Sequence, residues 1–346
     1  MLIPILLFVL GLVVLIKGGD WFVDGATGIA RRFRLPELLI GATVVSIGTT
    51  LPEVMVSATS AFGGQGDMAY GNAIGSIICN TALIAAITVA IKPAKVDRRA
   101  LIIPVSSFFI AAAFYAVISY VTGYFARWVG ILLLILFAAY MTVTVLNMKK
   151  SHEPEVAKTE EKDDTSLSDA EYSALSGGKK ILAHIKGTKN TVVREIILLI
   201  IGAALIAWGA NLLVDNGTII AEKLGVPQSV IALTFVALGT SLPELVTAIT
   251  SLIKGHGSLS LGNIIGANIF NLVLVSGVSV TLAPFNIPVS SILFGQNASL
   301  VLDIPLMFTV MLVLTVPALI FKRLFRFQGI LLLLIYAAFC TLQFVM

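Results

Sequence analysis

The stretch GTTLPE at Gly48–Glu53 decides the fold, because it returns almost unchanged as GTSLPE at Gly239–Glu244. Each copy places a carboxylate, a proline and two adjacent hydroxyls inside a long apolar run. A charged side chain without a partner costs at least about 2.5 kcal/mol at the centre of a membrane, so such residues mark functional sites. The repeated stretch therefore predicts one polar site that both halves of the chain build.

The composition places this site in a membrane. Of the 346 residues, 58% are hydrophobic and 12% are charged, and the mean hydropathy is +0.99. The apolar runs are roughly 18 to 25 residues long without strict alternation, which favours helices that cross a hydrocarbon core over the strands of a barrel. The first run, Leu2 to Ile16, has no preceding basic residue and no cleavage site, so we interpret it as a transmembrane helix rather than a signal peptide.

We expect an all-α, polytopic membrane protein with ten transmembrane helices. The predicted spans are 3–24, 37–62, 68–91, 100–121, 128–148, 193–215, 227–253, 258–281, 299–321 and 328–346.

An offset of 191 residues relates the two halves. It matches Gly18 to Gly209, Pro36 to Pro227, Gly48 to Gly239, Pro52 to Pro243, Glu53 to Glu244, Gly71-Asn72 to Gly262-Asn263, Gly75 to Gly266, and Asn80 to Asn271. Similar composition explains matched leucines but not matched Pro, Glu, Asn and Gly at one constant offset. Since equivalent helices are five spans apart, an odd number, the halves have opposite orientation in the membrane.

The sequence thus predicts two inverted five-helix repeats, 1–148 and 192–346, joined by a linker at 149–191. The repeated motifs lie within about 37–91 and 227–281. Inverted repeats with interrupted helices near the middle of the membrane are typical of secondary transporters. The prolines at 52 and 243 predict such interruptions, because each leaves the carbonyl four residues earlier, at Gly48 or Gly239, free to bind a cation.

Basic residues set the expected orientation, since cytoplasmic loops are enriched in them. Three loops that should share one side contain Arg31, Arg32 and Arg34; Lys92, Lys95, Arg98 and Arg99; and Lys322, Arg323 and Arg326. The loops at 63–67 and 283–297 have none. We therefore expect both termini outside, the polar 149–191 linker in the cytoplasm, and a plasma or inner membrane location. Asp20, Asp24 and Asp215 are expected to have structural or interfacial roles.

Every candidate ligand in the motifs is an oxygen. The candidates are Glu53, Glu244, Thr49, Thr50, Thr240, Ser241, Ser76, Asn80 and Asn271. Thr49 and Glu53 are four residues apart and share a helix face, as do Ser76 and Asn80. The repeated glycines are expected to allow close helix contact beside the site; they are Gly71, Gly75, Gly262 and Gly266. Flexible oxygen cages suit Ca²⁺ better than Mg²⁺, and two carboxylates balance one Ca²⁺ or two Na⁺. Zinc is disfavoured, because the three histidines lie in predicted loops.

The segments GTTLPE…GNAIGSIICN and GTSLPE…GNIIGANIFN resemble the two α-repeats of the sodium/calcium exchanger family, prokaryotic type, within the cation/calcium antiporters. The resemblance covers nearly the whole chain. It implies exchange of Na⁺ for Ca²⁺, with Glu53 and Glu244 as central ligands. It also implies that the backbone carbonyls of Ser46 and Ala237 contribute. The side chains that it implies at the remaining calcium and sodium positions are Thr49, Thr50, Thr240, Ser241, Ser76 and Asn80.

Two positions depart from the family pattern. Ala267 stands where many relatives have Ser, and Asn271 stands where many have Asp. The first change removes a hydroxyl from one expected sodium position, and the second lowers the negative charge of the site. Exchangers that also move potassium resemble one another in having an acid at the position of Asn271, so potassium dependence is not expected here.

Three alternatives remain at the sequence level. A proton/cation antiporter would use the same glutamates as proton sites, a cation channel would use the same oxygens, and an intramembrane hydrolase would need a nucleophile–base pair that the spans lack. We expect no cofactor, no nucleic-acid binding and no obligate protein partner. The expected partners are the lipid bilayer and the transported ions Na⁺ and Ca²⁺. Cys79 and Cys340 lie in different spans and predict no disulfide.

Overall fold

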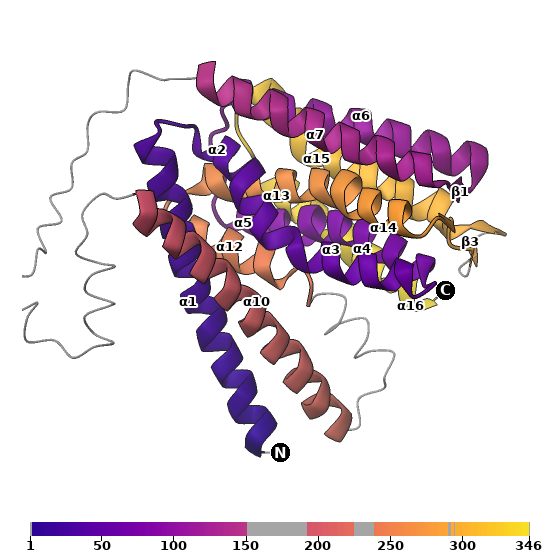
Figure 1. The fold of residues 1–346 in the computed structure, drawn as a ribbon, viewed down its shortest axis with the longest axis horizontal. Coiled ribbons are helices and arrows are strands. Elements are labelled where there is room, and N and C mark those ends of the chain that lie inside the picture. The colour runs from indigo at the N-terminus through magenta and orange to yellow at the C-terminus, as the bar shows by residue number, and fades with distance from the viewer. Residues whose placement is uncertain (1, 151–191, 225–238, 290–291, 294, 346) are drawn as a thin grey trace, which may run out of the picture.

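A computed structural model describes residues 2–150, 192–224, 239–289, 292–293 and 295–345. Within these residues the chain is almost entirely helical, and nine helices are long and apolar enough to cross a membrane. The predicted all-α, polytopic fold is thus confirmed (Figure 1). The tenth expected span, 227–253, begins outside the described residues, and its described part is the 12-residue helix α12, Leu242–Ile253.

The first half contains α1 (Leu2–Arg32) and a second span that joins α2 (Glu37–Ile40), the π-helical η1 (Gly41–Val45) and α3 (Ser46–Phe62). A third span joins α4 (Gly66–Cys79), η2 (Asn80–Ala85) and α5 (Ala86–Ile91), and α6 (Arg98–Thr122) and α7 (Arg127–Lys150) follow. The second half contains α10 (Val192–Lys223), α12, α13 (Gly257–Phe270), η4 (Asn271–Val275), α14 (Ser276–Leu282), η5 (Ser299–Asp303), α15 (Ile304–Phe321) and α16 (Arg326–Val345).

Helices α1 and α10 form a pair that slants away from the rest of the bundle (Figure 1). Glycines make the close approach possible: a Cβ added to Gly18 would lie 2.8 Å from the Ile206 nitrogen, and one on Gly25 would lie 2.7 Å from the Leu199 nitrogen. Helix α1 reaches Arg32 rather than residue 24, and its extension packs on α10 through Gly25 and Gly28, which meet Leu199 and Glu195. Helix α10 reaches Lys223 rather than residue 215.

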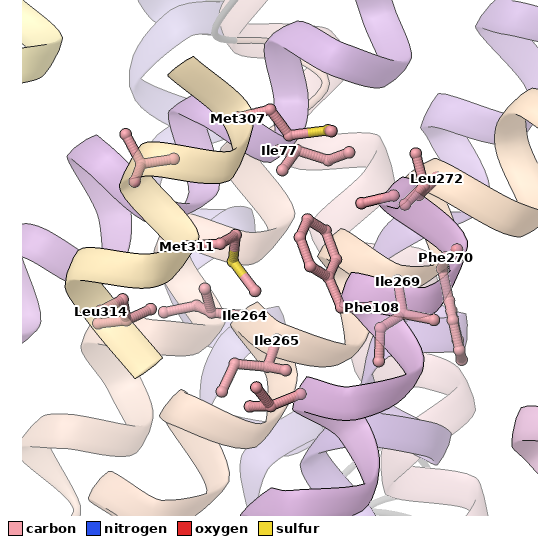
Figure 2. Close-up of a cluster of buried hydrophobic side chains, with 14 of the residues drawn as sticks. Ile77, Phe108, Ile264, Ile265, Ile269, Phe270, Leu272, Met307, Met311 and Leu314 are labelled. Atoms are coloured by element: carbon pink, nitrogen blue, oxygen red, sulfur yellow. The ribbon is translucent and has the colours of Figure 1, made fainter. Parts of the chain in front are cut away.

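The largest apolar core lies where α4, α6, α13 and α15 meet. Figure 2 shows Phe108 of α6 between Met311 of α15 and Ile269 of α13. All three side chains are at most 1% exposed. This packing fixes the helices that carry the repeated Gly-Asn motifs, so the polar side chains next to the core are held in place.

The loops gather on two opposite faces. On one face, the Val96 nitrogen donates to the Lys322 carbonyl at 2.9 Å and the Leu324 nitrogen donates to the Ala94 carbonyl at 3.0 Å, which brings two of the basic loops together. On the other face, β1 (Tyr124–Phe125) pairs antiparallel with β2 (Phe285–Asn286), and β3 (Ile292–Leu293) pairs with β4 (Gln296–Asn297). We call the first of these the basic face and the second the opposite face.

Candidate cation site

The two repeated glutamates meet inside the bundle. Glu53 comes from α3 and Glu244 from the first turn of α12, and both are 0% exposed. Thr50, three residues before Glu53 on α3, donates to Oε1 of Glu244 at 3.5 Å, so Glu244 lies against the helix that carries Glu53. The structure therefore brings together the acidic residues of the two halves, as the repeat predicts.

These carboxyl groups lack the partners that buried acids normally have. Both oxygens of Glu53 and Oε2 of Glu244 accept no hydrogen bond among the described residues. Oε1 of Glu244 accepts one long bond from the Thr50 hydroxyl at 3.5 Å. No ion pair joins either glutamate to a basic side chain in the described part of the chain. Buried charges are normally paired or bind a metal ion, so this arrangement calls for a cation.

Further oxygens on segments that contact these two helices are also unsatisfied, since η2 contacts α12 and η4 contacts α3. Asn80 and Asn271 are 0% exposed, and none of their side-chain polar atoms has a partner within the described ranges. The hydroxyl of Ser241 is also buried without a hydrogen-bond partner among the described residues. Asn80 and Asn271 each begin a π-helical segment, η2 and η4, in which the backbone is locally widened. Such segments occur often at functional sites, and here they occur at equivalent positions of the two repeats.

The remaining predicted ligands vary in their surroundings. The Thr49 hydroxyl donates to Asn263 Oδ1 at 3.2 Å, and the Thr240 hydroxyl donates to Asn72 Oδ1 at 3.3 Å. Ser76 lines a cavity of about 510 Å³ beside the site, together with Asn72 and Thr240. Ser46 is buried, but its hydroxyl donates to Gly41 and Asn263. Ala237 lies outside the described residues.

The prolines act differently from the prediction. Pro52 lies inside a continuous α3, and the irregular backbone of that span is η1, which begins eleven residues earlier at Gly41. Pro243 lies in the first turn of α12, where a proline fits because its missing N–H would be unpaired anyway. The Gly239 carbonyl is not left free, since it accepts from the Leu242 nitrogen at 3.3 Å. The expected interruption is therefore present only in the second copy among the described residues.

Two asparagines that the sequence marked only as repeat matches position the site. Asn263 of α13 accepts from Thr49 and contacts Ser46, which ties α13 to α3. Asn72 of α4 donates to the Glu53 carbonyl at 3.1 Å and to the Ser57 hydroxyl at 2.7 Å. Each Asn follows a glycine, and this Gly-Asn pair at a constant offset was the signal that could have identified them.

The repeated glycines are used unequally. A Cβ on Gly266 would lie 2.6 Å from the Ala42 Cα, and one on Gly262 would collide with Leu38, so the predicted close contact of α13 with the second span is confirmed. Gly71 and Gly75 are the equivalent positions of α4, and both line the cavity. A Cβ added to either of them would meet no atom of another described segment within 4 Å. For those two glycines the predicted close contact is wrong.

A polytopic helical membrane protein whose repeated motifs bring a pair of buried, unpaired carboxyl groups onto contacting helices has the features of a secondary ion carrier. The chain belongs to the sodium/calcium exchanger protein family, whose model matches residues 3–146 and 194–345. The family resemblance of the repeated motifs is thereby confirmed.

Relatives and solved structures agree with this family. The chain is 36% identical over 266 residues to uncharacterized membrane protein MJ0091 of Methanocaldococcus jannaschii, which covers 77% of each chain. It is 28% identical to sodium/calcium exchanger MaX1 of Methanosarcina acetivorans, over 98% of each chain. The solved structure of the sodium-calcium exchanger NCX_Mj soaked with zero Na⁺ and Ca²⁺ superposes with a TM-score of 0.76, at 31% identity and 99% coverage of both chains.

Proposed function

We propose that this protein is a secondary antiporter that exchanges Na⁺ for Ca²⁺ across a membrane, by alternating access to the site of Glu53 and Glu244. The observation that carries the proposal is the pair of fully buried carboxyl groups from oppositely oriented halves, with three of their four oxygens unpartnered among the described residues. Family membership supports the same activity.

The charge of the site suits this exchange. Two carboxylates carry two negative charges, which either one Ca²⁺ or two Na⁺ neutralise. Hydroxyl and amide oxygens complete a cage of hard ligands, which both ions prefer. We assign these roles to Thr49, Thr50, Thr240, Ser241, Ser76, Asn80 and Asn271, with backbone carbonyls of Ser46 and Ala237. Because Asn271 adds no third carboxylate, the cage has no excess charge to hold a potassium ion together with calcium.

Coupling follows from the cost of moving an empty site. Two unneutralised carboxylates would have to cross an apolar barrier, and that cost is large when no cation accompanies them. An occupied site is neutral and crosses more easily, so Na⁺ and Ca²⁺ take turns on the same ligands. The α1–α10 pair is the element that we assign to the movement, because it packs tightly within itself and slants away from the bundle (Figure 1).

The same proposal includes the topology. We assign 1–148 and 192–346 to the two inverted repeats, the basic face and the 149–191 linker to the cytoplasm, and both termini to the outside of a plasma or inner membrane. Support comes from the hydrogen bonds that join two basic loops on one face and from the enrichment of Lys and Arg in cytoplasmic loops.

Calcium uptake into proteoliposomes tests the function when Na⁺, K⁺ and H⁺ gradients are imposed separately. We expect uptake with the outward Na⁺ gradient only. Uptake driven by the pH gradient alone would instead establish a proton/cation antiporter, and uptake without any counter-gradient would establish a channel. Glu53→Gln and Glu244→Gln should abolish the sodium-driven uptake. Asp97→Asn is the matched control, because Asp97 is an exposed carboxylate that caps α6, and Asn caps a helix equally well.

A further inference from the structure

An ion-pair cluster connects α1 to the end of α12 on the basic face. Nζ of Lys254 lies 2.8 Å from Asp24 Oδ1 and 3.5 Å from Asp20 Oδ1, and it donates to the Asp20 carbonyl at 2.8 Å. The Lys254 side chain is 25% exposed. It therefore holds one helix of the slanting pair to the helix that carries Glu244.

Close packing reinforces the connection one turn away. A Cβ on Gly19 of α1 would lie 2.6 Å from Val246 Cγ1 and 3.0 Å from Thr250 Oγ1. Thr250 is only 8% exposed as a result. The contact between α1 and α12 is thus closed along the part of α12 that approaches the basic face.

The repeat relates the contact between α1 and α12 to an equivalent contact between α10 and α3. The offset of 191 converts Asp24 to Asp215, Asp20 to Asn211 and Lys254 to Gly63. The equivalent contact between α10 and α3 therefore has one of the two acids and no cation at the position that corresponds to Lys254. Asp215 is exposed, and no ion pair involves it in the described part of the chain.

The side chains next to these two contacts also differ in how deeply they are buried. Val246 corresponds to Met55, and Thr250 corresponds to Thr59. Met55 is 63% exposed and Thr59 is exposed, whereas Val246 is half-buried and Thr250 is buried. The α3–α10 contact on the opposite face is therefore open where the equivalent α1–α12 contact is closed.

We propose that Lys254 is a positioning residue that acts as a one-sided latch: its pairs with Asp20 and Asp24 close the basic face and bias the carrier toward the conformation that is open at the opposite face. This inference rests on the proposed alternating access. Inverted repeats exchange their conformations when the carrier changes sides, so a contact that only one repeat can make stabilises only one of the two states.

The size of the bias follows from the exposure of the pair. A partly exposed ion pair shifts an equilibrium by a modest amount, which corresponds to about a two- to fivefold change in the ratio of the two states. Since apparent affinity scales with the fraction of competent carrier, neutralising Lys254 should strengthen apparent Ca²⁺ affinity at the basic face and weaken it at the opposite face. A loss of stability alone would lower transport from both sides equally.

Three variants test the latch in oriented vesicles. Lys254→Met should shift the half-saturating Ca²⁺ concentrations of the two faces in opposite directions, so that their ratio changes by about two- to fivefold. Lys254→Arg should restore the wild-type values, because it retains the charge. Gly63→Lys should shift both values the other way, since it offers Asp215 a cation. Residue 63 has φ −74°, which L side chains adopt, and its Cβ would lie 3.3 Å from the Thr59 carbonyl oxygen.

A distance measurement tests the latch without relying on transport. Spin labels at Arg31→Cys and Ile253→Cys, in a background with both native cysteines replaced by alanine, report the separation of α1 and α12; Ile253 is 78% exposed and accessible to the label. Lys254→Met should increase the population with the longer distance, and Lys254→Arg should not. An unchanged distance distribution, or equal shifts of Ca²⁺ affinity at both faces, would overturn the latch. Absence of sodium-driven uptake by the wild-type protein would instead overturn the proposed function.

Discussion

Removing one carboxylate from the site should harm Ca²⁺ far more than Na⁺. Glu244→Gln keeps the shape of the side chain and one oxygen ligand, but it removes one negative charge from a site with 0% exposure. In a protein environment with an effective dielectric constant of about 20, two unit charges about 4 Å apart attract each other by roughly 4 kcal/mol. The loss is therefore about 4 kcal/mol for a monovalent ion and about 8 kcal/mol for a divalent one.

The difference of about 4 kcal/mol corresponds to roughly a thousandfold change in the ratio of the two dissociation constants. Titration calorimetry of Ca²⁺ and Na⁺ binding to the purified protein measures this ratio directly. Glu53→Gln should behave in the same way, because the two glutamates are equivalent by the repeat and equally buried. The exposed Asp97→Asn variant should leave both affinities unchanged.

The role of charge is tested by the ratio of the Ca²⁺ and Na⁺ dissociation constants rather than by either constant alone. If Glu244→Gln weakened both ions by the same factor, the carboxylate would act as an ordinary oxygen ligand or as a structural group, and the reasoning would be refuted. Ca²⁺ affinity close to that of the wild type would remove Glu244 from the site altogether.

Three further changes follow from the contacts around the site. Asn263→Leu should cost about 1–3 kcal/mol of stability, because it leaves the buried Thr49 hydroxyl of α3 without its acceptor; thermal unfolding in detergent measures this loss, and an unchanged midpoint would show that the bond contributes nothing. Gly262→Ala should cost about 1–3 kcal/mol through collision with Leu38, whereas Gly257→Ala on the same helix should be tolerated, since its Cβ would lie 3.5 Å from Ala94; equal midpoints for the two variants would contradict the packing. Asn271→Asp adds a third carboxylate to the cage and should strengthen Ca²⁺ binding more than Na⁺ binding, as calorimetry can measure; weaker Ca²⁺ binding would place Asn271 away from the ion.

The sequence predicts the position of a transmembrane helix well where the run is purely apolar. It predicts the end of a helix less well where packing extends that helix. Nothing in the run around Gly25 predicts that α1 continues to Arg32, because the cause is contact with Leu199 of α10, far away in the sequence. The helix interruptions that the two prolines predict also depend on a feature that the sequence does not show. Whether a proline breaks a helix depends on where the helix begins, and α12 begins beside Pro243 whereas α3 begins well before Pro52.

The site shows the same division. Glu53 and Glu244 were identifiable from sequence, because a carboxylate in an apolar run has few explanations other than function, and a constant offset pairs the two. The repeated Gly-Asn pair marks Asn72 and Asn263 in the sequence, but the partners of these two side chains were not identifiable from it. Their partners lie on other helices, as far as 217 residues away for Asn263 and Ser46, and hydropathy carries no information about which side chains meet.

The sequence by itself determined that this protein crosses the membrane repeatedly, and it predicts two inverted halves whose two acids belong to one polar site. Those properties follow from composition, from the parity of the spans and from the cost of burying charge. Only the tertiary structure decided that Gly262 and Gly266 pack closely while Gly71 and Gly75 line a cavity, and that Lys254 pairs with acids of α1 while its equivalent, Gly63, cannot. The repeat makes the two halves nearly identical in sequence pattern, so their difference arises from how the helices pack against one another.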